Sequence, residues 1–258
     1  MSNHTNGVAN GSANGADPFR KTCLVPYVDP KTAPPAVAEK INVLPFRRNI
    51  FLLLGHSEGL FPHLMGVIGG CFNGKVRTVP LLDWVSSSPP SDFLLFFPVR
   101  HPSNSSLQQL IVLRTASTLG AKYEYDVNLP VAEVYEMDPA KITAISTCSP
   151  ASVVAGDGPW SARDRVILRV VDEQLATYTN EPHTIDDALQ HLSVAELVEV
   201  LIILGTYALI ARVIRGLKID DDVPIRPDGL HEMLKKSVTP TVPKKDQGGV
   251  AAAAAAGQ

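Results

Sequence analysis

The chain has 258 residues, of which 45% are hydrophobic and 19% are charged, and its formal net charge at pH 7 is −3. This length accommodates one substantial hydrophobic core, or two repeats of a smaller unit. Because no basic block or RNA-binding signature is present, the composition gives no reason to expect a nucleic-acid partner.

The two ends of the chain differ in composition from its middle. Residues 1–17 are rich in Asn, Gly, Ser and Ala, and residues 239–258 include an alanine run, so both are predicted to be disordered tails. The N-terminal tail lacks the apolar core of a signal peptide. The longest apolar run, Val200–Ala211, has 12 residues, short of the roughly 20 that cross a bilayer. We expect a soluble, cytoplasmic protein with no membrane contact.

The chain has three widely spaced cysteines, Cys23, Cys71 and Cys148, and no CxxC pair. This pattern is typical of reduced thiols and not of a disulfide framework.

The sequence between the tails is predicted to be mostly helical. Ser161 with Asp164, and Ser193 with Glu196, place an N-cap hydroxyl three residues before a carboxylate. Thr184 before Asp187 gives the same signal, and Asp138-Pro139 places a cap before a proline at the first helical position. Helices are expected near 47–54, 60–73, 106–119, 122–136, 139–147, 161–178, 184–190 and 194–216.

Two segments have unusual patterns. The helix from Val194 to Gly216 is apolar nearly all round between residues 200 and 211, so it must be buried in a core or a subunit interface. Residues 81–105 combine a serine–proline loop with an apolar run, and their prolines prevent one long helix. They are expected to form an irregular insertion that packs on the body or covers a cleft.

The stretch Leu110–Ala132 resembles a known junction. The segment LQQLIVLRTASTLGAKYEYDVNLPVAEVYEMDPAKITAI resembles the core motif of carboxymuconolactone decarboxylase-like proteins, within the AhpD-like superfamily. Upstream, NIFLLLGHSEGLFPHLMGVIGGCFNGKV resembles the family's first helices, and RVILRVVDEQL and ELVEVLIILGTYALIARVIRGLKID resemble its closing pair. The resemblance covers about residues 36–222 and implies a single all-α, AhpD-like domain. It also implies a homo-oligomer, a trimer or hexamer, built through helices like Val194–Gly216.

The residues at the motif's chemical positions are unusual. The superfamily's peroxidases use Cys-x-x-Cys-x-x-x-His with a glutamate on the preceding helix, because a thiolate, a resolving thiol and a proton relay are needed. Those positions fall at Ala121, Glu124, Asn128 and Gln109, so a thiol peroxidase is disfavoured. The decarboxylase-like branch often keeps Tyr-Glu followed by His; here Tyr123 and Glu124 remain, and Asn128 takes the histidine position.

The resemblance therefore implies a cofactor-free lyase or isomerase that acts on a small carboxylated, lactone or polyketide-type molecule. Glu124 would shuttle a proton, while Tyr123 and Asn128 would bind an oxygen. Arg114 would counter a substrate carboxylate or hold Glu124. Further candidate substrate-binding residues are Tyr125, His56 and His63. The alternative is a catalytically degenerate member that acts as a binding or assembly protein.

Each candidate also has a purely structural interpretation. Glu124 could pair with Arg114 or Lys122, the tyrosines could be core aromatics with a satisfied hydroxyl, and a lone histidine on a helix is usually structural. No metal or other cofactor is predicted. The group that comes nearest to metal-ligand spacing is His183, Asp186, Asp187 and His191, but its acids are better explained as charges at the start of a helix.

Overall fold

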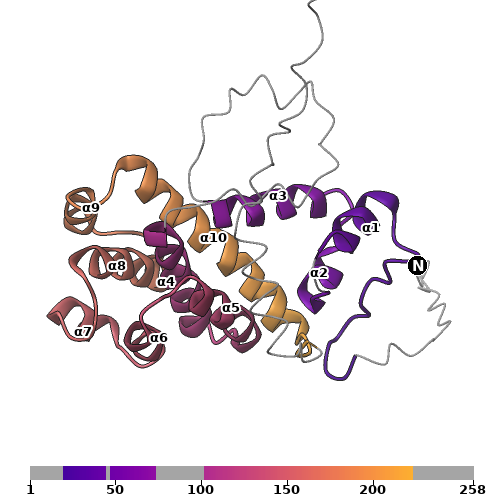
Figure 1. The fold of residues 1–258 in the computed structure, drawn as a ribbon, viewed down its shortest axis with the longest axis horizontal. Helices are drawn as coiled ribbons and strands as arrows, with labels where there is room; N and C mark the ends of the chain where they lie inside the picture. The colour runs from indigo at the N-terminus through magenta and orange to yellow at the C-terminus, as the bar shows by residue number, and fades with distance from the viewer. Residues whose placement is uncertain (1–19, 45–46, 74–101, 223–258) are drawn as a thin grey trace, which may run out of the picture.

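The computed structural model describes residues 20–44, 47–73 and 102–222, and the regular secondary structure of these ranges is α-helical (Figure 1). In chain order the helices are α1 (Pro35–Asn42), α2 (Asn49–Leu54), α3 (Phe61–Asn73), α4 (Pro102–Thr118), α5 (Lys122–Val134), α6 (Pro139–Ile145), α7 (Pro150–Ala155), α8 (Ala162–Thr177), α9 (Pro182–Leu189) and α10 (Val194–Leu217).

Helix α4 lies at the centre of the packing. It contacts α3, α5, α6, α8 and α10, and α10 crosses the molecule with α1–α3 on one side and α5–α9 on the other (Figure 1). The four consecutive residues of the range 110–113 are all at most 1% exposed. A helix that is buried all round must have neighbours on every face, which α4 obtains from these helices.

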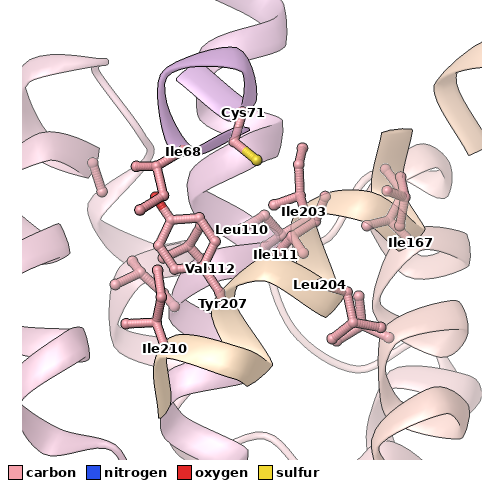
Figure 2. Close-up of a cluster of buried hydrophobic side chains, with 14 of the residues drawn as sticks. Ile68, Cys71, Leu110, Ile111, Val112, Ile167, Ile203, Leu204, Tyr207 and Ile210 are labelled. Atoms are coloured by element: carbon pink, nitrogen blue, oxygen red, sulfur yellow. The ribbon is translucent and has the colours of Figure 1, made fainter. Parts of the chain in front are cut away.

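Helix α10 is the second central helix. Its 24 residues are long and apolar enough, by composition, to cross a membrane, but more than half of its most apolar stretch is buried inside the fold. Ile203, Leu204, Tyr207 and Ile210 pack there against α3, α4 and α8 (Figure 2). Their packing explains the apolar run as part of a protein core.

Most of the helix-start signals are confirmed. Complete capping boxes form at Ser161 with Asp164 and at Ser193 with Glu196, and the Asp138 carboxylate accepts a hydrogen bond from the Ala140 amide. The cap proposed at Thr184 is wrong.

Helix α9 instead begins at Pro182, since proline is favoured at the first position of a helix. Thr184 lies within the first turn, where its hydroxyl donates to Glu173 Oε1 (2.6 Å) and accepts from Arg169 Nη2 (2.9 Å).

Three differences from the sequence prediction concern helix extent. Helices α1 and α7 were not anticipated, although α7 has a Ser149-Pro150 start of the same kind as Asp138-Pro139. Helix α4 begins at Pro102, so residues 102–105 are helical and not part of an irregular insertion. Residues 81–101 and the tails 1–17 and 239–258 lie outside the described ranges.

Asp220 fastens the N-terminal segment to the end of α10. Its carboxylate accepts hydrogen bonds from the Thr22 amide (2.5 Å), the Thr22 hydroxyl (2.7 Å), the Lys21 amide (3.0 Å) and the Tyr27 hydroxyl (3.1 Å). Burial alone would raise the pKa of this carboxyl group, but these donors outweigh burial and lower it to about 2. Asp220 is therefore ionised wherever the protein is folded near neutral pH.

We expect Asp220→Asn to lower the free energy of unfolding at pH 7 by about 2–3 kcal/mol, because the buried carboxylate and the charge assistance of its hydrogen bonds are lost. The difference should shrink as the pH falls from about 4 towards 2, since the wild-type carboxylate then takes up a proton. Urea denaturation measures both effects. The matched control is Asp221→Asn at an exposed neighbour, and equal losses in the two variants would contradict the assignment.

Candidate active site

The candidate site is built on the turn between α4 and α5. Gly120 has a φ of +63°, a left-handed conformation that glycine adopts without strain. Around it the Ala121 amide donates to the Ala116 carbonyl (2.8 Å), which ends α4 and starts α5 within a few residues. This sharp reversal packs the first turn of α5 onto α4 and places Glu124 inside the protein, with 1% of its surface exposed.

The Glu124 carboxyl group is buried without compensation. Neither of its oxygens has a hydrogen-bond partner among the residues that the structure describes. Burial raises the pKa of this carboxyl group from 4.5 to about 9, because a charged form would lose its hydration. Glu124 is therefore protonated at neutral pH and can donate a proton.

The pairings considered for Glu124 are not formed. Lys122 pairs with Asp126 one turn along α5, and Arg114 pairs with Asp172. Asn128, which is also buried, donates from its amide nitrogen to the backbone carbonyl of Glu124 (2.8 Å) rather than to the carboxyl group. The structural interpretation of Glu124 as half of a salt bridge is wrong.

Tyr207 lies within electrostatic range of Glu124 and beside Gln108, and Gln109 follows Gln108 on α4. We call these four residues, Gln108, Gln109, Glu124 and Tyr207, the buried polar cluster. Gln108 and Gln109 of α4 are 2% and 0% exposed, and none of their side-chain amide atoms has a hydrogen-bond partner among the described residues. Together with Glu124 they contribute six such atoms. Buried polar atoms in folded proteins nearly always have a partner, so a group of six without one among the described residues marks a candidate site for a small polar molecule.

Tyr207 links the cluster to α10 and α3. Its ring lies among apolar side chains of α3, α4 and α10, near Cys71 (Figure 2). The pKa of its hydroxyl is raised mainly by burial and further by the Cys71 thiol and by Glu124, while the Gln108 amide lowers it. Tyr207 therefore lies within electrostatic range of both, with the Gln108 amide close by but not in hydrogen-bond geometry. It remains a neutral hydroxyl.

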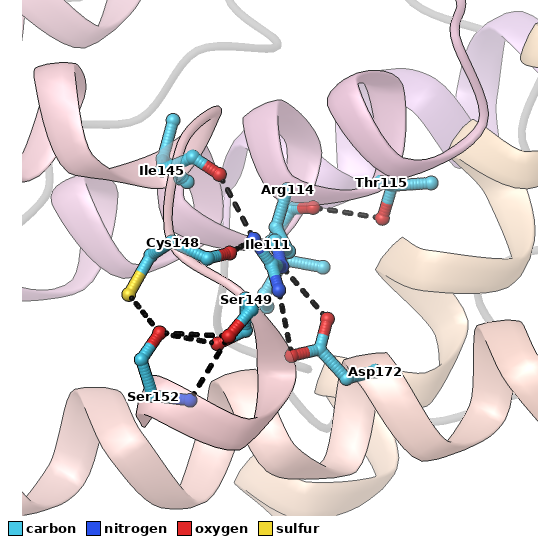
Figure 3. Close-up of polar contacts among 8 residues, drawn as sticks. All are labelled: Ile111, Arg114, Thr115, Ile145, Cys148, Ser149, Ser152 and Asp172. Atoms are coloured by element: carbon cyan, nitrogen blue, oxygen red, sulfur yellow. Dashed lines mark hydrogen bonds and ion pairs between the residues drawn. The ribbon is translucent and has the colours of Figure 1, made fainter. Parts of the chain in front are cut away.

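Arg114 belongs to a different buried network (Figure 3). Its guanidinium binds Asp172 of α8 through two parallel contacts, Nε to Oδ1 at 2.7 Å and Nη2 to Oδ2 at 2.9 Å. Its Nη1 donates to the carbonyls of Cys148 (2.7 Å) and Ile145 (3.0 Å). These contacts use four of the five N–H groups of the buried guanidinium. The expected contact with Glu124 is absent, and the charge of Arg114 is neutralised by Asp172.

The two tyrosines of α5 point away from Glu124. The Tyr123 hydroxyl donates to Asp222 Oδ1 (2.8 Å), and burial followed by this carboxylate raises the pKa of Tyr123. The Tyr125 hydroxyl donates to the Ile142 carbonyl at 3.5 Å. Both hydroxyls thus have structural partners, whereas the cluster's tyrosine comes from α10.

The two candidate histidines are exposed. His56 Nε2 lies 2.7 Å from the carbonyl oxygen of Pro26, and His63 lies on the outer side of α3. The structure does not bring either ring into the buried polar cluster.

In the described ranges, His, Cys, Asp and Glu side chains do not gather in groups of three that could hold a metal ion. Of the four residues weighed for a metal, Asp187 pairs with Arg169 (2.9 Å).

Sequence reasoning missed Gln108 and Tyr207. The signal for Gln108 was present, because two adjacent amides interrupt an apolar helix at LQQLIVL. Tyr207 gave no such signal, since an aromatic residue inside an apolar helix usually indicates packing.

No family model matches the sequence, and no curated protein is similar to it in sequence. The structure, however, is similar to the crystal structure of an alkylhydroperoxidase AhpD core, an uncharacterized peroxidase-related protein from Ralstonia eutropha JMP134. The two share a TM-score of 0.58 and 12% sequence identity, over 86% of this chain and 99% of that one. The chain therefore has the AhpD-like all-α fold, as its motifs predicted. At this identity the likeness establishes the fold alone.

We expect the raised pKa of Glu124 to make stability depend on pH. Between pH 4.5 and 9 the folded protein keeps a proton that the unfolded chain releases, so a rise in pH favours unfolding. From pH 5 to 7.5 this lowers the free energy of unfolding by about 3 kcal/mol. Glu124→Gln should remove that component and become more stable than wild type at pH 7.5.

Urea denaturation of wild type, Glu124→Gln and the exposed control Glu133→Gln at the two pH values measures the effect. If the free energy of unfolding changed between the two pH values by the same amount in wild type and in Glu124→Gln, Glu124 would be ionised in the folded protein and the assignment would be wrong.

Proposed function

We propose that the protein is a cofactor-independent lyase or isomerase of the decarboxylase-like type, which acts on a small carboxylated, lactone or polyketide-type molecule. One observation carries this proposal: the buried carboxyl group of Glu124 has no partner among the described residues and a pKa of about 9. Perturbed, unsatisfied acids of this kind are concentrated at functional sites.

A protonated Glu124 suits a reaction that passes through an enol or enolate. In an isomerisation it gives its proton to one substrate atom and recovers a proton from another, so the carboxyl group ends as it began. In a decarboxylation the carbon–carbon bond to the carboxylate breaks, carbon dioxide leaves, and the electron pair left on the substrate takes the Glu124 proton. Solvent then restores the acid, and no oxidant or reductant is needed.

The remaining cluster residues supply hydrogen bonds to the reacting molecule. The amides of Gln108 and Gln109 have donors without protein partners among the described residues, and they can hold a substrate oxygen on which negative charge develops. Asn128 has its amide nitrogen committed to the Glu124 backbone, so it steadies the first turns of α5. The oxygen-binding role that the resemblance implied for Tyr123 and Asn128 is therefore proposed for the amides of Gln108 and Gln109.

The thiols give no support to a peroxidase. All three cysteines are free, with Cys23 and Cys71 buried and Cys148 half-buried. The pKa of the Cys71 thiol, which lies nearest to the cluster, is raised chiefly by burial. A raised pKa lowers the fraction of thiolate, which is the form that attacks peroxide.

We expect Glu124→Gln to lower the rate of proton transfer by about 100-fold or more, because an amide cannot exchange the proton. The measurement is deuterium uptake from D2O into a panel of small lactones, ketones and β-keto acids, followed by proton NMR. The wild-type rate should decline above pH 9 as Glu124 ionises. Glu133→Gln, on the exposed side of the same helix, should behave as wild type.

Two results would argue against this assignment. Full activity of Glu124→Gln would show that another group is the acid. Failure of every panel compound to react with wild type would favour the binding or assembly alternative.

We also propose that the chain forms a homo-oligomer through an apolar stripe on α10. Four of its residues on one face are between 41% and 67% exposed, namely Val194, Val198, Ile202 and Leu209. Gly205 lies among them, and a side chain added there would meet open space, so a second helix can approach closely.

The charges of α10 favour a second copy of the chain as the occupant of this stripe. The N-terminal half of the helix carries Glu196 and Glu199, and the C-terminal half carries Arg212 and Arg215. Antiparallel pairing of two copies about Gly205 brings acidic halves towards basic halves and opposes the two helix dipoles. The trimer or hexamer suggested by the family resemblance stays a prediction.

Ile202→Glu should convert the oligomer into monomers, because the introduced carboxylates would be buried in the contact. Sedimentation velocity at micromolar concentration measures the change. Val67→Glu is the matched control, since Val67 is equally exposed but lies on α3. A wild-type protein that is already monomeric at that concentration would contradict the proposal.

A further inference from the structure

We propose that the buried polar cluster selects an uncharged carbonyl compound, such as a lactone, ketone or ester, over a carboxylate. The inference rests on the proposed function for the location of the site, and it narrows the substrate class that the proposed function leaves broad. Three features of the described residues carry it: the chemistry of the cluster's free donors, the commitments of the surrounding cations, and the behaviour of Glu124 towards an anion.

The polar groups of the cluster carry no charge at neutral pH. Gln108 and Gln109 each present an amide with two N–H donors and one carbonyl acceptor. Tyr207 presents a neutral hydroxyl, because burial raises its pKa. A carbonyl oxygen satisfies such donors without bringing a net charge into the core, and a hydrophobic wall suits the rest of an uncharged molecule.

The cations on the helices around the cluster all have other partners. Helix α3 contains no Lys or Arg, and α4, α5 and α10 together contain four. Arg114 is held by Asp172 and two carbonyls. The others are Lys122, which pairs with Asp126, Arg212, which donates to the Ala208 carbonyl and the Tyr178 hydroxyl, and Arg215, which donates to the Leu119 carbonyl. Lys122, Arg212 and Arg215 are also exposed, so none of the four offers a charge to a buried anion.

Glu124 offers an anion no positive charge in either protonation state. As a carboxylic acid it is neutral and contributes one hydrogen bond. As a carboxylate it would repel a second negative charge at close range. A substrate carboxylate in this site would therefore lose its hydration without gaining a counter-charge from the residues that the structure describes, and burying such an unpaired charge is strongly unfavourable.

This selectivity separates the two reactions that the proposed function allows. A decarboxylation substrate must bring its carboxylate into the site, whereas the isomerisation of a lactone or enone need not. The neutral cluster thus favours the isomerase over the decarboxylase.

Methyl levulinate and levulinate provide a matched pair of probes, because they share the ketone and differ mainly in charge at neutral pH. We expect the full-length protein to bind the ester at least ten times more tightly at pH 7, as measured by ligand-observed NMR titration. Levulinate affinity should rise as the pH falls towards about 4.5, where the ligand itself becomes protonated. Gln108→Leu should weaken ester binding about tenfold or more, whereas Gln190→Leu, at the exposed residue that follows α9, should not.

Equal or tighter binding of levulinate at pH 7, or no binding of either probe, would overturn the inference. Ester binding that is unchanged by Gln108→Leu would also overturn it. A circular dichroism spectrum checks that Gln108→Leu folds. If it does not fold, Gln109→Leu is the second variant for the same measurement.

The proposed function fails separately. The proposed function would be contradicted, and the selectivity for uncharged compounds would remain, if the ester bound as expected but Glu124→Gln left deuterium exchange unchanged. It would stand, without the neutral preference, if a β-keto acid reacted in a Glu124-dependent way and the carboxylate probe bound best.

Discussion

The buried ion pair between Arg114 and Asp172 is the constraint on which the arrangement of the helices depends. Breaking a buried charge pair strands the remaining charge, so the geometry around it must be kept. The guanidinium contacts α8 through Asp172 and the two ends of the α6–α7 connection through the carbonyls of Ile145 and Cys148. It thereby fixes α4 against three neighbours at once. Gln108 lies six residues before Arg114, about 120° away around the axis of α4 at 3.6 residues per turn. The ion pair and the polar cluster therefore occupy different sides of α4.

Two buried acids in this fold show how environment decides a role. Asp172 has both oxygens bound by one guanidinium, and it serves structure. Glu124 has neither oxygen bound by a described residue, and its proton stays on the carboxyl group at neutral pH. A fold that fully satisfies one buried carboxyl group but leaves another open incurs an energetic cost for the second. Such costs are kept where they serve a function.

Local chemistry explains what the sequence could predict, and tertiary packing explains what it could not. Capping boxes at Ser161 and Ser193 act within one helical turn, so they were readable. The family motif placed Glu124 in the first turn of the helix after the Gly120 break, and the structure has it there. The sequence did not predict which tyrosine lies near Glu124. Tyr123 is its neighbour in sequence but its hydroxyl binds Asp222, whereas Tyr207 of α10 lies within electrostatic range of Glu124. Arg114 was misassigned for the same reason, because its partner on α8 matches no motif.

The same comparison of motif positions gives the site its chemical character. Where the resembling peroxidases have two thiols, a histidine and a glutamate, this chain has Ala121, Glu124, Asn128 and Gln109. Three of these side chains cannot ionise, and burial keeps the fourth protonated. The turn around Gly120 that joins α4 to α5 holds these positions together. They offer neutral hydrogen-bonding groups and a single acid in place of a thiolate and its proton relay, which is why the function proposed for this site is a proton transfer and not an electron transfer.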